Sequence, residues 1–181
     1  MAAESILANT HAQATTEGAA ARFDALIAQH GASLLRLARA YTNTAADGED
    51  LFQDITLSIW QALPKFRGES SERTFIYRIA HNRSLAHLAR RPNRLMELPQ
   101  EETVRDTRPD PEQQLAGEQQ RNAFLAAVRR LPADYRRVIV LVLEGLSHDE
   151  VADVLGLNTG TVAVRVNRAK QMLRELLKEQ L

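Results

Sequence analysis

The sequence predicts an all-α protein of two small helical domains joined by a flexible acidic linker, the second with a helix-turn-helix. Three observations predict this fold. Helix-forming residues dominate the chain of 181 residues, aromatic residues make up only 5%, and β-branched alternation is scarce. An acidic segment rich in proline divides two stretches of helical periodicity, and residues 143–176 show the pattern of two helices joined by a tight turn.

Composition excludes several functional classes. The chain has no cysteine, so neither a disulfide framework nor a thiolate metal site is possible. It contains no run of 18 apolar residues and no signal-peptide pattern, so we expect a cytoplasmic protein without membrane insertion. The five histidines are scattered without i, i+4 pairs, and no phosphate-binding glycine loop or nucleophile–base pattern is present. We therefore expect no enzyme, no catalytic residue, no cofactor and no metal.

Charge is balanced overall, with 23 basic and 23 acidic residues, but it is arranged in blocks. Residues 65–94 hold eight Lys or Arg and two acids, a net charge of about +6, and residues 95–118 hold seven acids and two arginines, about −5. Residues 161–178 hold five bases and one acid, about +4. Such blocks indicate separate surfaces with separate partners.

The first domain is expected at residues 22–92, after a disordered tail at residues 1–21. Its first helix spans 23–41, with a bend or a break at Gly31. A loop at 42–47 leads to a helix at 48–63, whose apolar side chains, Leu57 and Trp60 included, are expected to face mostly inward. Pro64 ends that helix, and a polar loop precedes a third helix at 71–89.

Arginines in the third helix are interleaved with Phe75 and Tyr77. Basic residues beside aromatic rings suit a nucleic-acid backbone with stacked bases, particularly a single strand. Alternatively, the helix presents a solvated arginine face and its aromatic rings lie in the core. The residues alone leave both interpretations open.

Residues 93–111 have the composition of a linker, with three prolines among Glu, Asp, Thr and Gln. The second domain is expected at 112–181. Pro132 separates a helix that ends near Leu131 from another that spans 134–143. The apolar run 138–143 could also form a buried strand, but the length of the segment, its helical neighbours and the need for a helix behind the turn motif favour a helix.

The segment LEGLSHDEVADVLGLNTGTVAVRVNRAKQMLREL contains the strongest motif. Ser147 and Glu150 form a capping box, Gly156 ends the first helix, and Asn158 is a candidate N-cap for the second. The second helix repeats apolar residues at steps of three and four and carries arginines on its other face. A helical hairpin in a core is the alternative, but the outward arginines favour a DNA-binding helix-turn-helix.

Several segments together resemble the extracytoplasmic-function group of the sigma-70 family of bacterial RNA polymerase initiation factors. DGEDLFQDITLSIWQAL is similar to the segment that binds the clamp coiled coil of the polymerase β′ subunit. FRGESSERTFIYRIAHNRSLAHLAR is similar to the segment that melts and reads the −10 element. RPDPEQQL, LPADYRRVIVLVLEGLSHDEVADVLGL and GTVAVRVNRAKQML resemble the domain that binds the −35 element.

The resemblance implies partners and sites. The partners are core polymerase at the β′ clamp coiled coil and the β flap, promoter DNA (duplex at −35, single-stranded at −10) and an anti-sigma factor. The residues implied for core binding are Asp47, Glu49, Asp50, Gln53 and Asp54. Those implied for −10 DNA are Arg67, Gly68, Glu69, Ser70, Ser71, Arg73, Arg78, Asn82 and Arg83. Those implied for −35 DNA are Asn158, Thr159, Thr161, Arg165, Arg168 and Lys170.

The chain also departs from the family pattern. Gly48, Asp54 and Phe75 replace the usual Ala, Glu and Trp. Ala163, Val164 and Asn167 stand where Lys, Ser and His are frequent on the helix that enters the groove, so we expect −35 recognition to depend on phosphate contacts and DNA shape. Two further functions stay open: a helix-turn-helix regulator that acts without polymerase, and a sigma-like scaffold that mainly binds proteins.

Overall fold

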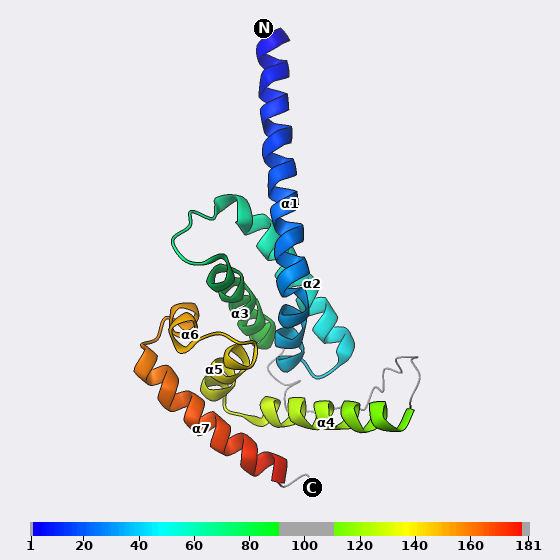
Figure 1. Cartoon of the computed structure of the whole chain (residues 1–181), viewed down its shortest axis with the longest axis vertical. Coiled ribbons are helices and arrows are strands. Elements are labelled where there is room, and N and C mark those ends of the chain that lie inside the picture. Colours follow the sequence, from blue (N-terminus) through cyan, green and yellow to red (C-terminus); the bar gives the residue numbers. More distant parts are fainter. Residues whose placement is uncertain (1, 91–110, 179–181) are drawn as a thin grey trace.

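The computed structural model describes residues 2–90 and 111–178, and within these ranges it is entirely helical (Figure 1). The first domain contains α1 (Ala2–Ala40), α2 (Ala45–Ala62), the short 3-10 helix η1 (Leu63–Lys65) and α3 (Glu72–Arg90). The second contains α4 (Pro111–Arg130), α5 (Ala133–Leu143), α6 (His148–Leu155) and α7 (Thr159–Lys178). The prediction of an all-α fold is confirmed. The expected linker at 93–111 lies, apart from Pro111, outside the described residues.

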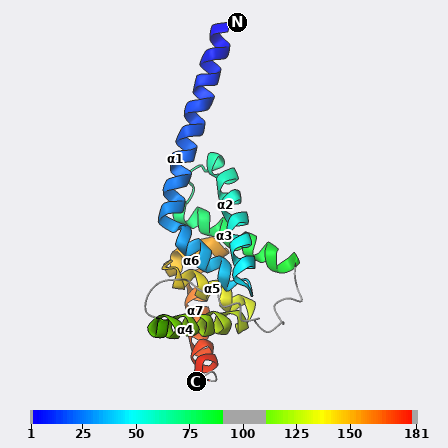
Figure 2. The same cartoon turned by 90° about the vertical axis from the view of Figure 1, so that its right-hand side faces the viewer.

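Helix α1 corrects two expectations about the N-terminal part of the chain. The helix begins at Ala2, so residues 2–21 are helical rather than a disordered tail, and their end of α1 projects from the bundle (Figures 1 and 2). The segment is rich in alanine, which has the highest helix propensity. Gly31 does not interrupt the helix; it is buried, and a Cβ there would lie 3.4 Å from Ile27 Cγ2 and 3.9 Å from Phe52 Cζ of α2.

Local capping defines most of the other helix ends. Thr44 caps α2, because its hydroxyl accepts a hydrogen bond from Asp47 N at 3.1 Å, so this helix begins three residues earlier than expected. Ser71 Oγ accepts from Thr74 N at 3.0 Å at the start of α3. The capping box of Ser147 and Glu150, the left-handed Gly156 (φ 65°) and the N-cap Asn158, which accepts from Thr161 N at 2.7 Å, are all confirmed.

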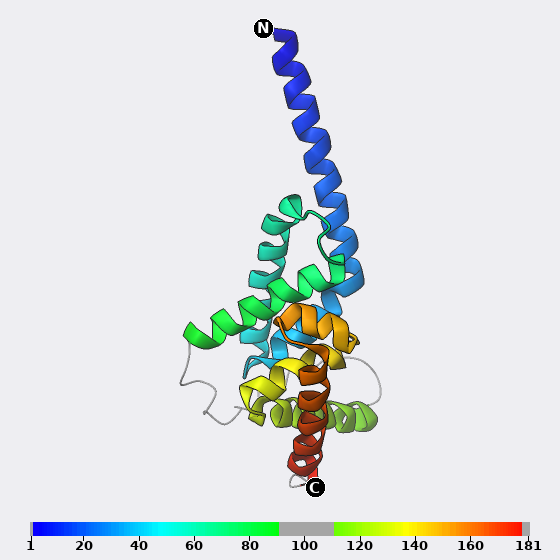
Figure 3. The same cartoon turned by 90° about the vertical axis from the view of Figure 1, so that its left-hand side faces the viewer.

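Each domain has an apolar centre, and the two centres join. Leu34, Leu51, Ile55, Ile59 and Ile76 are fully buried in the first domain. In the second, the fully buried residues include Leu131, Val138, Val151, Val162 and Ala169. Helix α3 lies against α6, and α1 meets α4 and α5, so both domains share one continuous core (Figure 3). Burial of this apolar area is the main contribution to stability.

Polar groups at the junction of the domains are only partly satisfied. Arg129 Nη1 donates to Thr42 O, at the end of α1, at 2.6 Å, and Arg136 donates to the Leu131 carbonyl at 3.0 Å. The hydroxyl of Tyr41 and Nδ1 of His81 are buried near α5 without a hydrogen-bond partner among the described residues. A buried unsatisfied group costs about 1–3 kcal/mol, so this junction is less stable than a purely apolar contact of equal area.

Burial lowers the pKa of His81 to about 4, and the positive charge of Arg137 acts in the same direction. Unfolding returns that pKa to near 6.5, so as the pH falls the unfolded chain takes up the proton first. Stability present above pH 6.5 is therefore lost progressively towards pH 4. We expect protonation of this histidine to lower the free energy of unfolding by about 3 kcal/mol between pH 7 and pH 4.

Chemical denaturation at several pH values measures this loss. His81→Gln is expected to flatten the pH dependence, whereas the control His148→Gln, at an exposed residue of α6, is expected to keep the wild-type slope. Equal slopes in wild type and His81→Gln would contradict the assignment.

Candidate polymerase and promoter interfaces

The exposed face of α2 carries the acidic residues expected to bind core polymerase. Four of the five candidates are exposed: Glu49, Asp50, Gln53 and Asp54. The last three follow Glu49 by one, four and five residues, so all four lie on one side of the helix. Glu49 lies 3.5 Å from Arg39 of α1, a solvent-exposed ion pair. Asp47 is half-buried in the first turn. The structure therefore brings four of the five candidate residues onto one accessible surface.

Two apolar side chains extend this surface, contrary to the expectation that they face inward. Leu57 is 55% exposed and Trp60 is 37% exposed, one and two turns beyond Gln53 on the same face. Trp60 is supported by Phe23 of α1 through an edge-on ring contact at 5.2 Å. Exposed large apolar residues beside charged ones are typical of a binding surface. Helical spacing from Asp50 and Gln53 could have identified both residues.

Close packing explains why glycine stands at position 48, where the family usually has alanine. A Cβ at this position would lie 2.8 Å from Arg39 Cγ and 3.1 Å from Thr42 Oγ1. Glycine therefore lets the start of α2 approach the end of α1 closely.

The loop before α3 presents most of the candidate −10 residues. Arg67, Gly68, Glu69 and Ser71 are exposed, and Gly68 has φ 75°, which glycine adopts without strain. The start of the loop is fixed by Phe66, whose ring lies 4.6 Å from that of Phe75. Ser70 is half-buried. The loop is thus anchored at one end and accessible at its tip.

Helix α3 places the remaining −10 candidates on two parts of its surface. Asn82 and Arg83 are exposed to solvent. Arg73, which is half-buried, and Arg78, which is exposed, reach the second domain, where each donates a hydrogen bond to a backbone carbonyl. Tyr77 is 1% exposed and Phe75 is half-buried, so the structure favours the core interpretation of both aromatic rings.

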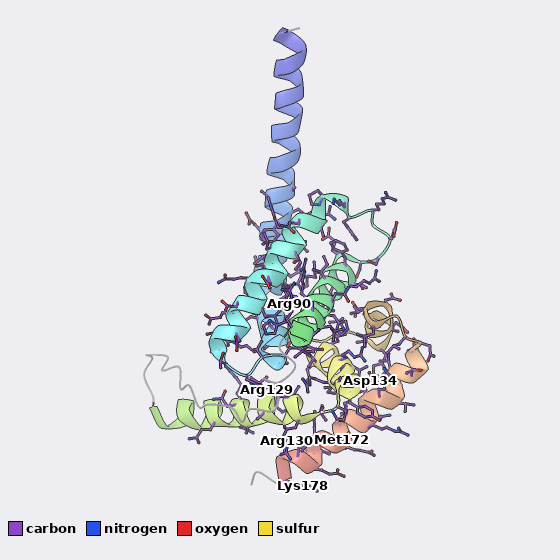
Figure 4. All side chains as sticks on the ribbon, turned by 180° about the vertical axis from the view of Figure 1, so that it is seen from behind. Arg90, Arg129, Arg130, Asp134, Met172 and Lys178 are labelled. Atoms are coloured by element: carbon purple, nitrogen blue, oxygen red, sulfur yellow. The ribbon has the colours of Figure 1, made fainter. Side chains whose placement is uncertain are left out.

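A groove of about 910 Å³ lies between the start of α5 and the first turns of α7. Among the candidate −35 residues it brings together Asn158, Thr161, Arg165 and Arg168. Arg165 Nη2 lies 3.6 Å from Asp134 Oδ2 of α5, and Asp134 also pairs with Arg137. Figure 4 labels Asp134 where α5 faces α7. Asp134 was not anticipated from the sequence, because its proximity to Arg165 arises only from the packing of α5 on α7.

Thr159 and Lys170 lie outside this groove. The Thr159 hydroxyl donates to Asp149 Oδ1 of α6 at 2.7 Å, which links the two helices of the helix-turn-helix. Lys170 is nine residues from Thr161, a rotation of about 180° around α7. Val164 is 53% exposed and Asn167 is exposed, so the outer face of α7 combines apolar and basic residues.

No helix in the described ranges is long and apolar enough to span a membrane. The same ranges contain no group of three or more His, Asp or Glu side chains that could hold a metal ion.

Family comparison agrees with this architecture. The Sigma-70 region 2 family matches residues 26–94, and the Sigma-70 region 4 family matches residues 121–173. The chain is 33% identical over 164 residues to the RNA polymerase sigma factor CnrH of Cupriavidus metallidurans, with 86% of each chain covered. It is 32% identical over 158 residues to the ECF RNA polymerase sigma factor SigE of Mycolicibacterium smegmatis, covering 86% of this chain and 61% of SigE.

The fold is similar to that of CnrH solved in complex with the cytosolic domain of CnrY. That similarity has a TM-score of 0.68 at 27% identity and covers 94% of this chain and 96% of CnrH. The two matched regions follow in the order that the sequence motifs indicated, one in each half of the chain. This chain belongs to the extracytoplasmic-function group of the sigma-70 family.

Proposed function

We propose that this chain binds core RNA polymerase and directs transcription initiation at promoters that it recognises by their −10 and −35 elements. The observation that carries the proposal is the presence, in one chain, of an exposed acidic and apolar α2 face and a basic helix-turn-helix. A DNA-binding module that acts alone needs only the second of these. Membership of the sigma-70 family supports the same conclusion.

Core binding is assigned to the exposed face of α2. Its carboxylates suit a basic partner surface, and Leu57 and Trp60 supply the apolar area that a stable interface requires. This chemistry fits the clamp coiled coil of β′, the site that the family resemblance implies.

Recognition at −10 is assigned to the loop 67–71 and to the polar face of α3. Extrusion of a base from the duplex costs a few kcal/mol, which contacts to the freed base and to its strand must offset. The exposed loop suits the base, and Arg73, Arg78, Asn82 and Arg83 suit the strand backbone.

Recognition at −35 is assigned to the groove side of α7. Asn158 and Thr161 lie at the helix N-terminus, where backbone N–H groups favour a phosphate. Arg165 and Arg168 add positive charge, and the exposed Val164 suits the methyl group of a thymine. Because Ala163 and Val164 stand where polar residues are frequent on the helix that enters the groove, DNA shape contributes to the selection of the site.

Control by an anti-sigma factor is part of the proposal. The similar structure of CnrH was solved with the cytosolic domain of CnrY, and that of RpoE from Bartonella quintana with the anti-sigma factor NepR. A sigma-like scaffold that mainly binds proteins is the second candidate function. The observation that favours it is the exposed apolar side chain of Val164 on α7.

Reconstituted transcription tests the function. Core polymerase with this chain is expected to start RNA synthesis at a defined set of promoters in fragmented genomic DNA. Core polymerase alone is the control. If the mixture produces no transcripts beyond those of core polymerase alone, the proposal is wrong.

Asp50→Arg tests the docking surface. Asp50 is exposed, so the free energy of unfolding is expected to change by less than about 0.5 kcal/mol. Reversal of the charge is expected to weaken binding to core polymerase by at least about tenfold, because like charges then face each other. Affinity is measured by titration of labelled core polymerase.

Glu175→Arg on α7 is the matched control, since it makes the same charge change at an exposed residue of the other domain. It is expected to leave core affinity within about twofold of wild type. Equal affinities for Asp50→Arg and Glu175→Arg would remove Asp50 from the interface.

A further inference from the structure

Arg22 of α1 contacts both ends of the loop 67–71, which is assigned to the −10 base. Its Nε donates to Glu72 Oε1, in the first residue of α3, at 2.7 Å, and its Nη2 pairs with the same oxygen. At the other end of the loop, its guanidinium carbon lies 5.3 Å from the centre of the Phe66 ring. A guanidinium group over an aromatic face at this distance is attracted by the ring. One side chain therefore joins the residue before the loop to the residue after it.

The turn of α1 that carries Arg22 is fixed against α2. The next residue, Phe23, contacts Trp60 of α2 edge-on, with 5.2 Å between the ring centres. Leu26, one turn later, is 5% exposed and belongs to the apolar core. The guanidinium group of Arg22 thus reaches the loop from a backbone segment that packing holds in place.

The shape of the loop is set at its base. The Phe66 ring lies on Phe75 of α3, and Ser71 Oγ caps that helix by accepting from Thr74 N at 3.0 Å. The tip, residues 67–69, is exposed, and Gly68 within it has φ 75°. Among these contacts at the base, those of Arg22 reach both ends of the loop.

Arg22 also offsets an unfavourable charge. Glu72 stands directly before Arg73, which is assigned to the strand backbone. An unpaired carboxylate at that position would repel the phosphates of a strand that passes from the loop to α3. Arg22 precedes residues 26–94, the segment that matches Sigma-70 region 2, so the family match does not include it.

We propose that Arg22 is a positioning residue for −10 recognition, which holds the loop 67–71 in the shape that receives the extruded base. The proposal rests on the assignment of this loop to the −10 base. Arg22 acts through Phe66 and Glu72, not through a contact with DNA. A loop that is already ordered loses less free energy when it binds, and contacts to a base depend on the shape of the loop more than contacts to phosphates do. Selectivity between bases therefore depends on Arg22 more than attraction to the strand does.

Base selectivity of the holoenzyme tests this role. The full-length chain, wild type or variant, is reconstituted with core polymerase and mixed with a pool of short random single-stranded oligonucleotides. Sequencing of the retained oligonucleotides gives the ratio between the most and the least favoured base at the most selective position. Core polymerase alone shows which preferences do not come from this chain.

Arg22→Gln and Glu72→Gln change the net charge in opposite directions, because one removes a positive and the other a negative charge. Both are nevertheless expected to lower the selectivity ratio, by about threefold to tenfold, since each breaks the same contact. The double variant is expected to lose no more selectivity than Arg22→Gln alone, as for two residues that act through one interaction. A purely electrostatic effect would instead change the total amount of retained DNA in opposite directions and leave the ratio unchanged.

Arg121→Gln on α4 and Glu175→Gln on α7 are the matched controls, since they make the same charge changes at exposed residues, and both are expected to keep the wild-type ratio. If Arg22→Gln keeps the ratio of Arg121→Gln, Arg22 does not position the loop. If Arg22→Gln lowers the ratio and Glu72→Gln does not, Arg22 does not act by joining the two ends, and the proposal is wrong. If the wild-type holoenzyme shows no preference beyond that of core polymerase, the −10 assignment of the loop fails and the role of Arg22 fails with it.

Discussion

Arg36, Arg73 and Arg78 cross from the first domain to the junction of α5 and α6, and the relative position of the two domains depends on these contacts together with the shared apolar core. Glu144 is central, since it ends α5 and accepts two of the three arginines. Charged groups fix orientation more than they add stability. The apolar contact between α3 and α6 therefore supplies the free energy, and the arginines select one docking geometry.

This geometry separates two kinds of surface. The α2 face, with its acids and with Leu57 and Trp60, lies open to a partner, as does the groove between α5 and α7. The side of α3 that carries Arg73 and Arg78 is in contact with α6 and the end of α5.

Features fixed by a few neighbouring residues could be predicted from the sequence. Ser147 with Glu150, Gly156, Asn158 and Pro132 define helix ends through bonds that span at most a few residues, and all are found where expected. The family resemblance named the candidate sites. The continuity of α1 through Gly31 was missed, because burial against Phe52 outweighs the helix propensity of glycine. The outward side chains of Leu57 and Trp60 were missed, although helical spacing from Gln53 places both on its face. The pair of Asp134 with Arg165 and the contacts of Glu144 depend on packing between distant segments, which periodicity does not record.

The central claim is that the exposed face of α2 binds core polymerase. Amide hydrogen exchange on the full-length chain, with and without saturating core polymerase, measures this face directly. The account predicts slower exchange in residues 49–60 when core polymerase binds. Unchanged exchange in these residues would contradict the account.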